Sequence, residues 1–220
     1  MSRLFVDSVT KSYNNRVILS DVFLSCEIGE VKGLIGRNGS GKSTLLKIIF
    51  GVEKAESKFV KVERNLIRST TDCKGLISYL PQNHFLPNGI KIIKIINLFL
   101  EKKYRKKLLT NEFVLPLLDK TSQELSGGQR RIIEILLLIH SKAKFILLDE
   151  PFNGVGPILK DYIAECILEV KEHKGVIITD HDYENVLKLS DNITFLKEGY
   201  LREIKDRSQL LELGYFVRMD

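Results

Sequence analysis

A glycine-rich stretch at residues 36–44 carries the strongest chemical signal in the chain. It matches the pattern G-x-x-x-x-G-K-[ST] of a phosphate-binding loop. Glycines let successive backbone N–H groups turn toward phosphate oxygens, and a helix beginning near Lys42 adds its positive end. We expect Lys42 to reach the β- and γ-phosphates of a nucleotide and Ser43 to ligate Mg²⁺. The loop consists of Gly36, Arg37, Asn38, Gly39, Ser40, Gly41, Lys42, Ser43 and Thr44.

Two acidic residues, Asp149 and Glu150, close a continuous apolar run at residues 145–148. Such a run is typical of a buried parallel strand. An Asp at its end can hold Mg²⁺, and an adjacent Glu can act as general base toward a water molecule. The pair by itself also fits a helix N-cap. The phosphate-binding loop upstream favours the catalytic interpretation.

A third stretch, Leu125-Ser-Gly-Gly-Gln129, opens a helix that runs through Leu138. Taken alone, it fits a simple N-cap. Together with the phosphate-binding loop, it resembles the signature of the ATP-binding cassette (ABC) family, and the resemblance covers Leu4 to about Ile204. It implies that Ser126, Gly127, Gly128 and Gln129 bind the γ-phosphate of a nucleotide held by a second subunit.

The resemblance extends to three single positions. Gln82, after Pro81, looks like the glutamine that touches Mg²⁺ and the attacking water. His181 looks like the histidine that hydrogen-bonds the γ-phosphate. Tyr13 stands where the family stacks an aromatic ring on adenine, although it also fits a residue that only packs on the small β-region.

The chain also departs from the family pattern. Gly156 stands where an acidic residue is common, in a loop that crosses the dimer interface. The segment from Gln82 to Ser126 is short, so we expect a trimmed helical subdomain and an atypical surface toward a permease.

Strand-like and helix-like segments alternate, which predicts an α/β fold with a largely parallel sheet. We expect helices where apolar residues recur at helical spacing, and the last two strands to form a hairpin. Gly51 is expected to end the first helix, and Pro81 to stop the strand before it. The expected strands are 4–6, 17–19, 22–24, 31–35, 75–80, 145–148, 176–178, 193–196 and 200–204, and the expected helices are 42–50, 90–100 and 158–170.

The resemblance implies a P-loop NTPase (RecA-like) core with a parallel sheet, a small antiparallel β-subdomain and a short helical subdomain. We expect a single domain over residues 1–220, with the helical subdomain inserted at about 84–135. Residues 205–220 lie outside any motif. A basic run at 102–107 within the insert fits either a solvated helix face or a contact with a partner or lipid headgroups.

Composition narrows the class of protein. The 220 residues are 44% hydrophobic and 28% charged, which excludes a disordered chain, a collagen-like repeat and a disulfide scaffold. The longest unbroken apolar run, 135–139, falls far short of the roughly 20 residues of a membrane-spanning helix. The N-terminus shows no secretory signal, and three cysteines without close spacing indicate reduced thiols. We therefore expect a cytoplasmic protein.

The leading hypothesis is the ATP-hydrolysing subunit of an ABC transporter, with ATP and Mg²⁺ as its ligands. Because one chain holds one loop and one signature, we expect a head-to-tail homodimer or a pair with a second ABC ATPase. An integral-membrane permease would be the other partner, on the inner face of the cell membrane. The alternative is a non-transport ABC ATPase in a soluble assembly.

Two further expectations complete the functional prediction. A nucleotide-binding module without turnover is disfavoured by the presence of both Glu150 and His181. The net charge of +6 is accompanied by no basic-aromatic groove, so we expect no specific nucleic acid. The segments 126–134 and 150–155 are most similar to cassettes for branched-chain amino acids and lipopolysaccharide export.

Overall fold

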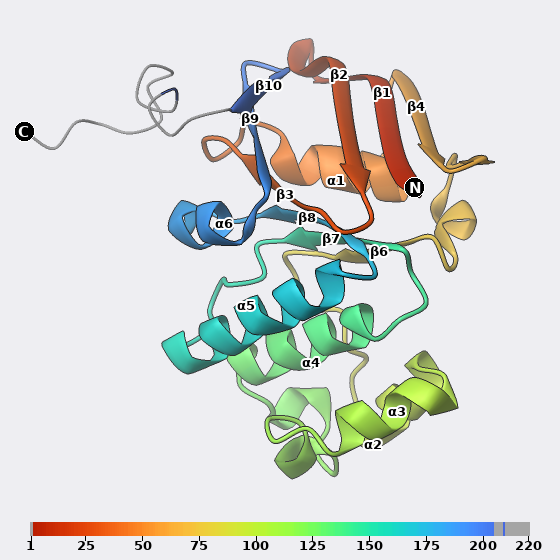
Figure 1. Cartoon of the computed structure of the whole chain (residues 1–220), viewed down its shortest axis with the longest axis vertical. Coiled ribbons are helices and arrows are strands. Elements are labelled where there is room, and N and C mark those ends of the chain that lie inside the picture. Colours follow the sequence, from red (N-terminus) through yellow and green to blue (C-terminus); the bar gives the residue numbers. More distant parts are fainter. Residues whose placement is uncertain (1, 205–208, 210–220) are drawn as a thin grey trace, which may run out of the picture.

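Two β-sheets and six α-helices form stacked layers in the computed structural model, which describes residues 2–204 and 209 (Figure 1). A four-stranded antiparallel sheet, ordered β2-β1-β4-β5, lies at the top of Figure 1. A six-stranded sheet, ordered β10-β9-β3-β8-β7-β6, lies in the middle with helices on both faces. This is the expected α/β fold with a largely parallel sheet and a small antiparallel β-subdomain. Residues 205–208 and 210–220 fall outside the described part, as does the C-terminal end of the expected domain.

The antiparallel sheet corrects one prediction from the sequence. Residues 17–19 and 22–24 were expected as separate short strands, but they belong to one strand, β2 (Arg16–Glu27), paired with β1 (Arg3–Tyr13). Asp21 adopts a left-handed φ of 48° where the register shifts, so a bulge bends the strand without ending it. The sheet is completed by β4 (Ser57–Val62) and β5 (Asn65–Leu66).

The central sheet confirms the expected strands. Its buried parallel strands are β3 (Val31–Ile35), β6 (Ile77–Leu80), β7 (Phe145–Asp149) and β8 (Gly175–Thr179). The predicted hairpin forms its edge as β9 (Asn192–Lys197) and β10 (Tyr200–Ile204). Since β3, β7 and β8 run in parallel, the loops that follow them meet at one edge of the sheet.

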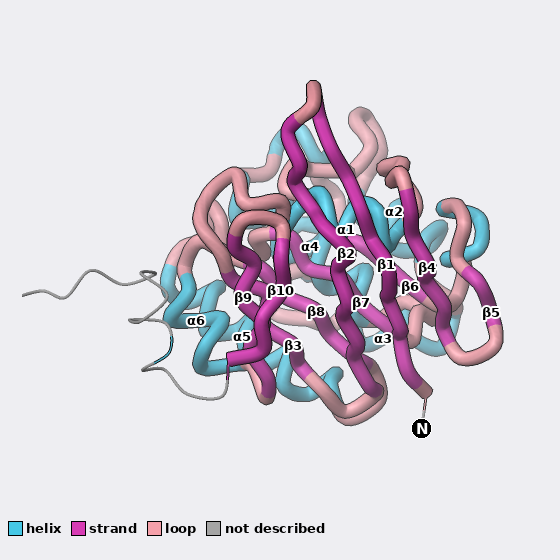
Figure 2. Tube along the Cα trace, turned by 90° about the horizontal axis from the view of Figure 1, so that it is seen from above, coloured by secondary structure: helices cyan, strands magenta, loops and turns pink. Residues whose placement is uncertain are grey.

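Alternate residues of the central strands pack into two different cores. One set joins the antiparallel sheet and α1 (Lys42–Phe50), as Leu34, Leu147 and Ile177 do. The other set packs against the helices on the opposite face, as Ile146 and Ile178 do. Figure 2 shows β1, β2 and β4 lying over α1. The helix has the predicted bounds, and Gly51 ends it with a left-handed φ of 80°.

Helices on the opposite face connect the central sheet to the predicted insert. The sheet is covered by α4 (Gly127–Ile139) and α5 (Pro157–Lys171), while α6 (Tyr183–Leu189) packs against β3. Beyond them, α2 (Ile92–Phe99) and α3 (Lys102–Leu109) lie at the bottom of Figure 1. Short 3-10 turns occur at Thr70–Cys73, Leu115–Leu117 and Ser122–Glu124.

All three cysteines are buried and free, as expected. Within the described residues, no helix has both the length and the apolarity needed to cross a membrane.

Candidate active site

A cavity of about 500 Å³ lies where the loops after β3, β7 and β8 meet. It unites residues that are far apart in the sequence: the phosphate-binding loop, the Gln82 segment, Glu150 and His181. This is the edge at which α/β sheets bind their ligands. Its walls are formed by Tyr13, Ile18, Asn38, Gly39, Ser40, Gly41, Lys42, Ser43, Thr44, Gln82, Glu150 and His181.

The phosphate-binding loop curls because its glycines adopt conformations that other residues avoid. Gly39 and Gly41 have left-handed φ values of 77° and 109°. A Cβ on Gly36 would lie 2.6 Å from the carbonyl oxygen of Leu196, so only glycine fits this close approach. Gly41 is also the N-cap of α1 and offers no side-chain acceptor, which leaves the first backbone N–H groups of the helix free for an anion.

Two polar side chains in this loop are poised for phosphate oxygens. The Lys42 ammonium donates to the carbonyl oxygens of Gly36 at 2.8 Å and Arg37 at 3.3 Å. Burial holds the pKa of Lys42 below its ordinary value, although nearby carboxylates oppose this. The Ser40 hydroxyl is buried and has no hydrogen-bond partner among the described residues. A bound phosphate would supply acceptors for both groups, so the loop fits a nucleotide.

Asp149 is fully buried at the end of β7 and accepts two hydrogen bonds. The Ser43 hydroxyl donates to its Oδ1 at 2.9 Å, and the Tyr79 hydroxyl donates to its Oδ2 at 2.9 Å. Burial raises the pKa of the Asp149 carboxyl, and the two hydroxyl donors lower it. Within the described residues, no cluster of three or more His, Cys, Asp or Glu side chains could hold a metal ion. The hydroxyl and carboxylate oxygens fit Mg²⁺ provided that phosphate oxygens complete its shell.

Glu150 occupies a strained position beside Asp149. Its φ of 54° is left-handed, a conformation that costs a non-glycine residue free energy and is common at active sites. Gln82 Nε2 donates to Glu150 Oε1 at 2.7 Å, and Asn153 Nδ2 donates to Glu150 Oε2 at 3.2 Å. His181 Nδ1 lies 3.8 Å from Glu150 Oε2. The structure therefore brings the predicted base, glutamine and histidine together.

Tyr13 lines the same cavity from the antiparallel sheet. The side chain is 43% exposed, and Lys11 Nζ lies 4.5 Å from its ring centroid. The ring is therefore partly exposed at the cavity wall instead of being buried in the β-region.

The signature residues are elsewhere. Ser126 caps α4 by accepting from the Gln129 N–H at 3.2 Å, while Gln129 Oε1 accepts from the Ser126 N–H at 3.0 Å. Gly127 and Gly128 form the first turn of this helix. None of the residues 126–129 lines the cavity, so one chain does not bring its signature to its own phosphate-binding loop.

Three buried charged residues hold the loops of the site, and the sequence did not reveal their role. Asp180 accepts from the backbone N–H groups of Phe152 and Asp182, each at 2.9 Å. Arg131 and Glu134 lie inside α4 and contact the segment that carries Gln82. For Arg131 and Glu134, the only signal in the sequence was a charged residue within the apolar stretch of a helix.

Comparison with known proteins identifies the family. The ABC transporter family model matches residues 19–153, a span that contains the phosphate-binding loop, the signature and Asp149-Glu150. The chain belongs to the ABC transporter ATP-binding family. It is an ATP-binding subunit of an ABC transporter and an ATPase.

Relatives of this ABC ATPase match along nearly the whole chain. The lipopolysaccharide export system ATP-binding protein LptB of Haemophilus influenzae is 32% identical over 90% of this chain and 88% of its own length. LptB of Escherichia coli K12 is 30% identical over 91% of this chain and 89% of its own length. These matches agree with the similarity of segments 126–134 and 150–155 to cassettes for lipopolysaccharide export.

Solved structures share the fold of this ABC ATPase. The ATP-binding subunit of an ABC transporter superimposes with a TM-score of 0.83 at 21% identity, over 96% of this chain and 93% of the other. A nucleotide-free ATP-binding cassette gives a TM-score of 0.78 at 26% identity, over 98% and 96% of the two chains.

Proposed function

We propose that this ABC ATPase hydrolyses ATP in a dimer whose two sites each combine the phosphate-binding loop of one subunit with the signature of the other, and so drives a separate membrane permease. The observation that carries this proposal is the hydrogen bond of 2.7 Å between Gln82 and Glu150 beside the phosphate-binding loop. It joins the proposed base to the segment that leads into the helical part of the chain.

In this proposal, residues Gly36 to Thr44 hold the phosphates and Tyr13 stacks on adenine. Ser43, Asp149 and Gln82 provide oxygen ligands for Mg²⁺. When bound, the ion would neutralise charge on the β- and γ-phosphates. Lys42 exchanges its two carbonyl partners for phosphate oxygens, a change that burial favours because it pairs the ammonium with an anion.

Glu150 is the general base in the proposed reaction. Its carboxylate accepts a proton from the attacking water. Gln82, whose Nε2 donates to Glu150 Oε1 at 2.7 Å, helps to orient that water. His181 lies on the same side of the cavity and hydrogen-bonds the γ-phosphate. These groups act mainly by positioning and by stabilising developing charge, as in other phosphoryl transfers.

The separation of loop and signature supports the proposed dimer. Ser126, Gly127, Gly128 and Gln129 lie outside the cavity, yet the start of α4 is suited to an anion. A second copy, or a second ABC ATPase, would bring its signature over the open side of the cavity. A structurally similar cassette is described as a dimer bound to ADP and phosphate, with a TM-score of 0.79 at 23% identity over 92% of this chain and 98% of the other.

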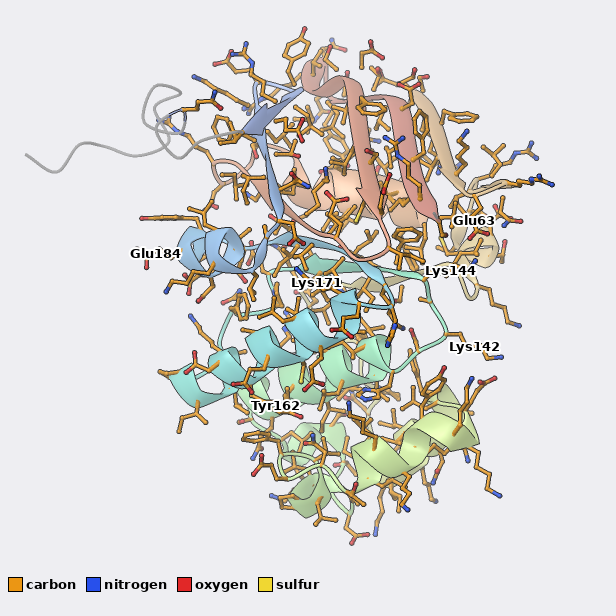
Figure 3. All side chains as sticks on the ribbon, viewed as in Figure 1. Glu63, Lys142, Lys144, Tyr162, Lys171 and Glu184 are labelled. Carbon is orange, nitrogen blue, oxygen red and sulfur yellow. The ribbon has the colours of Figure 1, made fainter. Side chains whose placement is uncertain are left out.

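A groove of about 710 Å³ between the core and the helical part is the proposed binding site for the permease. Its aromatic walls include Phe50, Tyr79, Phe85 and Tyr104, while Lys142 on the loop after α4 lines it at the position labelled in Figure 3. Phe85 belongs to the segment that carries Gln82, so a permease helix here would touch the active-site loop.

This arrangement defines the remaining parts of the proposal. The chain forms one cassette domain over residues 1–220, with the helical subdomain at about 84–135. It works at the cytoplasmic face of the cell membrane. Gly156 is the N-cap of α5 and has no acidic side chain, so we expect weaker communication between the two sites across the dimer interface.

The test uses Glu150→Gln protein, with Lys42→Ala as its matched control. With ATP and Mg²⁺, Glu150→Gln protein should form a dimer that retains ATP and should capture a polytopic membrane protein from detergent-solubilised membranes of the source cell. Lys42→Ala protein should lose ATP binding and remain monomeric. A folded Glu150→Gln protein that stays monomeric with ATP would contradict the dimer. Capture of soluble proteins alone would favour the non-transport alternative.

A further inference from the structure

Helix α3 has a high density of positive charge. Five of its eight residues are basic: Lys102, Lys103, Arg105, Lys106 and Lys107. The surrounding segment 85–120 contains eight basic and three acidic residues, in a chain whose total net charge is +6. Most of the excess charge of the protein is therefore carried by one small part of its surface.

The geometry of α3 turns these cations outward. Leu108 is fully buried and Tyr104 lines the groove proposed for the permease, so they form the inner face of the helix. At 100° per residue, the five basic positions cover the remaining arc. All four lysines are exposed. The result is an exposed basic face, and Lys107 at its edge also lines a cavity of about 470 Å³ beside Tyr162 and Glu169.

Only part of this charge is balanced within the protein. Lys107 lies 3.4 Å from Glu169, and Lys103 lies 3.9 Å from Glu101, which also pairs with Lys142. Among the described residues, neither Lys102 nor Lys106 takes part in an ion pair within 4.0 Å. Surface pairs of this kind contribute little to stability, so stabilisation of the fold does not explain the basic residues of α3.

An exposed apolar side chain accompanies the basic face. Leu98 of α2 is 85% exposed, and α2 packs against α3. Phe99 and Leu100, which follow it, line the groove. Basic residues next to an exposed leucine are the combination that peripheral proteins use at a membrane surface.

We propose that the outer face of α3 binds the anionic phospholipid headgroups of the membrane that holds the permease. This inference rests on the proposed function, because the groove beside α3 faces the membrane only if a permease occupies it. An exposed face with dispersed lysines suits a diffuse negative surface better than one folded acidic partner. Each lysine close to such a surface strengthens binding roughly fivefold, within a Debye length of about 10 Å.

The experiment measures co-sedimentation of the purified full chain with phosphatidylcholine vesicles that contain or lack phosphatidylglycerol. Binding should require phosphatidylglycerol and should weaken with salt. The variant Lys102→Gln, Lys103→Gln, Lys106→Gln should bind these vesicles roughly tenfold or more weakly. The control Lys54→Gln, Lys188→Gln, Arg202→Gln removes the same charge from exposed positions on other elements and should bind like the parent protein.

Three outcomes would overturn the inference. They are equal loss of binding in both triple variants, equal binding to vesicles without phosphatidylglycerol, and stronger binding to soluble polyglutamate than to anionic vesicles. The last outcome would indicate an acidic protein segment as the partner. Both variants should retain ATPase activity in solution, since neither touches the cavity.

The experiments can contradict the lipid contact of α3 without contradicting the proposed function, and the reverse. Capture of a permease by Glu150→Gln protein tests the function and requires no free lipid. If Glu150→Gln protein captures a permease but the protein does not bind anionic vesicles, only the proposed lipid contact of α3 is wrong. If vesicles bind through α3 but no membrane protein is captured, the transporter partnership is in doubt and the basic face remains a lipid-binding surface.

Discussion

At the scale of single residues, Glu150 shows how backbone strain serves the site. Its φ of 54° turns the chain sharply at the end of β7, where its N–H donates to the Thr179 carbonyl oxygen at 2.7 Å. The turn points the carboxylate toward Gln82 and the cavity, whereas Asp149 beside it stays buried. A left-handed conformation at a non-glycine residue costs about 1–2 kcal/mol. The fold tolerates this cost because the carboxylate is needed at that point.

A comparison of two substitutions measures that strain. Glu150→Gly and Glu150→Ala both remove the carboxylate, so both should abolish hydrolysis. Only glycine adopts φ near +54° without strain, so Glu150→Gly protein should be more stable than Glu150→Ala protein by about 1 kcal/mol. Urea denaturation of the two variants measures the difference. Equal stabilities would mean that the loop relaxes to a right-handed conformation once the side chain is gone.

The sequence revealed the types of the site residues but not their conformations. The phosphate-binding loop, Asp149 and Glu150 stand out because glycines, a lysine and carboxylates at fixed spacing have few other uses. The hydrogen bond from Tyr79 to Asp149 could not be predicted, since it joins strands β6 and β7, whose pairing depends on the whole sheet. The left-handed φ of Glu150 likewise arises from tertiary contacts that override local preference.

At the scale of elements, α4 ties the signature to the Gln82 segment. Ser126 caps the helix, and one turn into it Arg131 donates to the carbonyl oxygens of Pro81 at 2.8 Å and Gln82 at 2.6 Å. Glu134 accepts from the Phe85 N–H at 2.7 Å and lies 3.4 Å from Arg131. Both charged side chains are buried. A displacement of α4 would therefore move the loop that carries Gln82.

Substitution of the buried pair tests this connection. Arg131→Met should destabilise the protein by about 3–5 kcal/mol, because it leaves Glu134 as a buried charge without its guanidinium. The double variant Arg131→Met, Glu134→Gln should recover part of that loss, since a neutral amide still accepts from the Phe85 N–H. Thermal unfolding gives the stabilities.

A second readout separates positioning from stability. If Arg131 positions the Gln82 segment, the double variant should bind ATP normally but hydrolyse it more slowly even where it is fully folded. Normal turnover in the double variant would show that the pair only stabilises the fold.

The elements themselves were predicted unevenly. The central strands and α1 follow from continuous apolar runs and helical spacing, and their predicted positions are confirmed. The continuity of β2 was missed because Ser20-Asp21 reads as a turn, and only pairing with β1 keeps the strand in register across the bulge. The burial of Arg131 and Glu134 was missed because local pattern does not reveal which loop will cover a helix.

At the scale of the whole molecule, the separation of the cavity from the signature determines how the protein must work. The cavity is lined by the phosphate-binding loop, Gln82, Glu150 and His181, and the start of α4 contributes nothing to its lining. In the proposed head-to-tail pair, each site depends on Lys42 from one chain and Ser126 from the other. A chain with a defective Lys42 and a chain with a defective Ser126 should then form one intact site between them. A site built from a single chain would not allow this.

Mixing Lys42→Ala protein with Ser126→Arg protein provides the test. Each variant alone should be nearly inactive, because every site in its homodimer carries a defect. In a mixed pair, one site collects both defects, while the other has an intact Lys42 and an intact Ser126. With random exchange and independent sites, the mixture should regain about a quarter of the parent ATPase activity, as two-fold symmetry requires. The control mixes the double variant with parent protein, whose mixed pairs contain no intact site. If mixed pairs form, as followed by differently tagged chains, and the activity does not return, the arrangement of two independent shared sites is wrong.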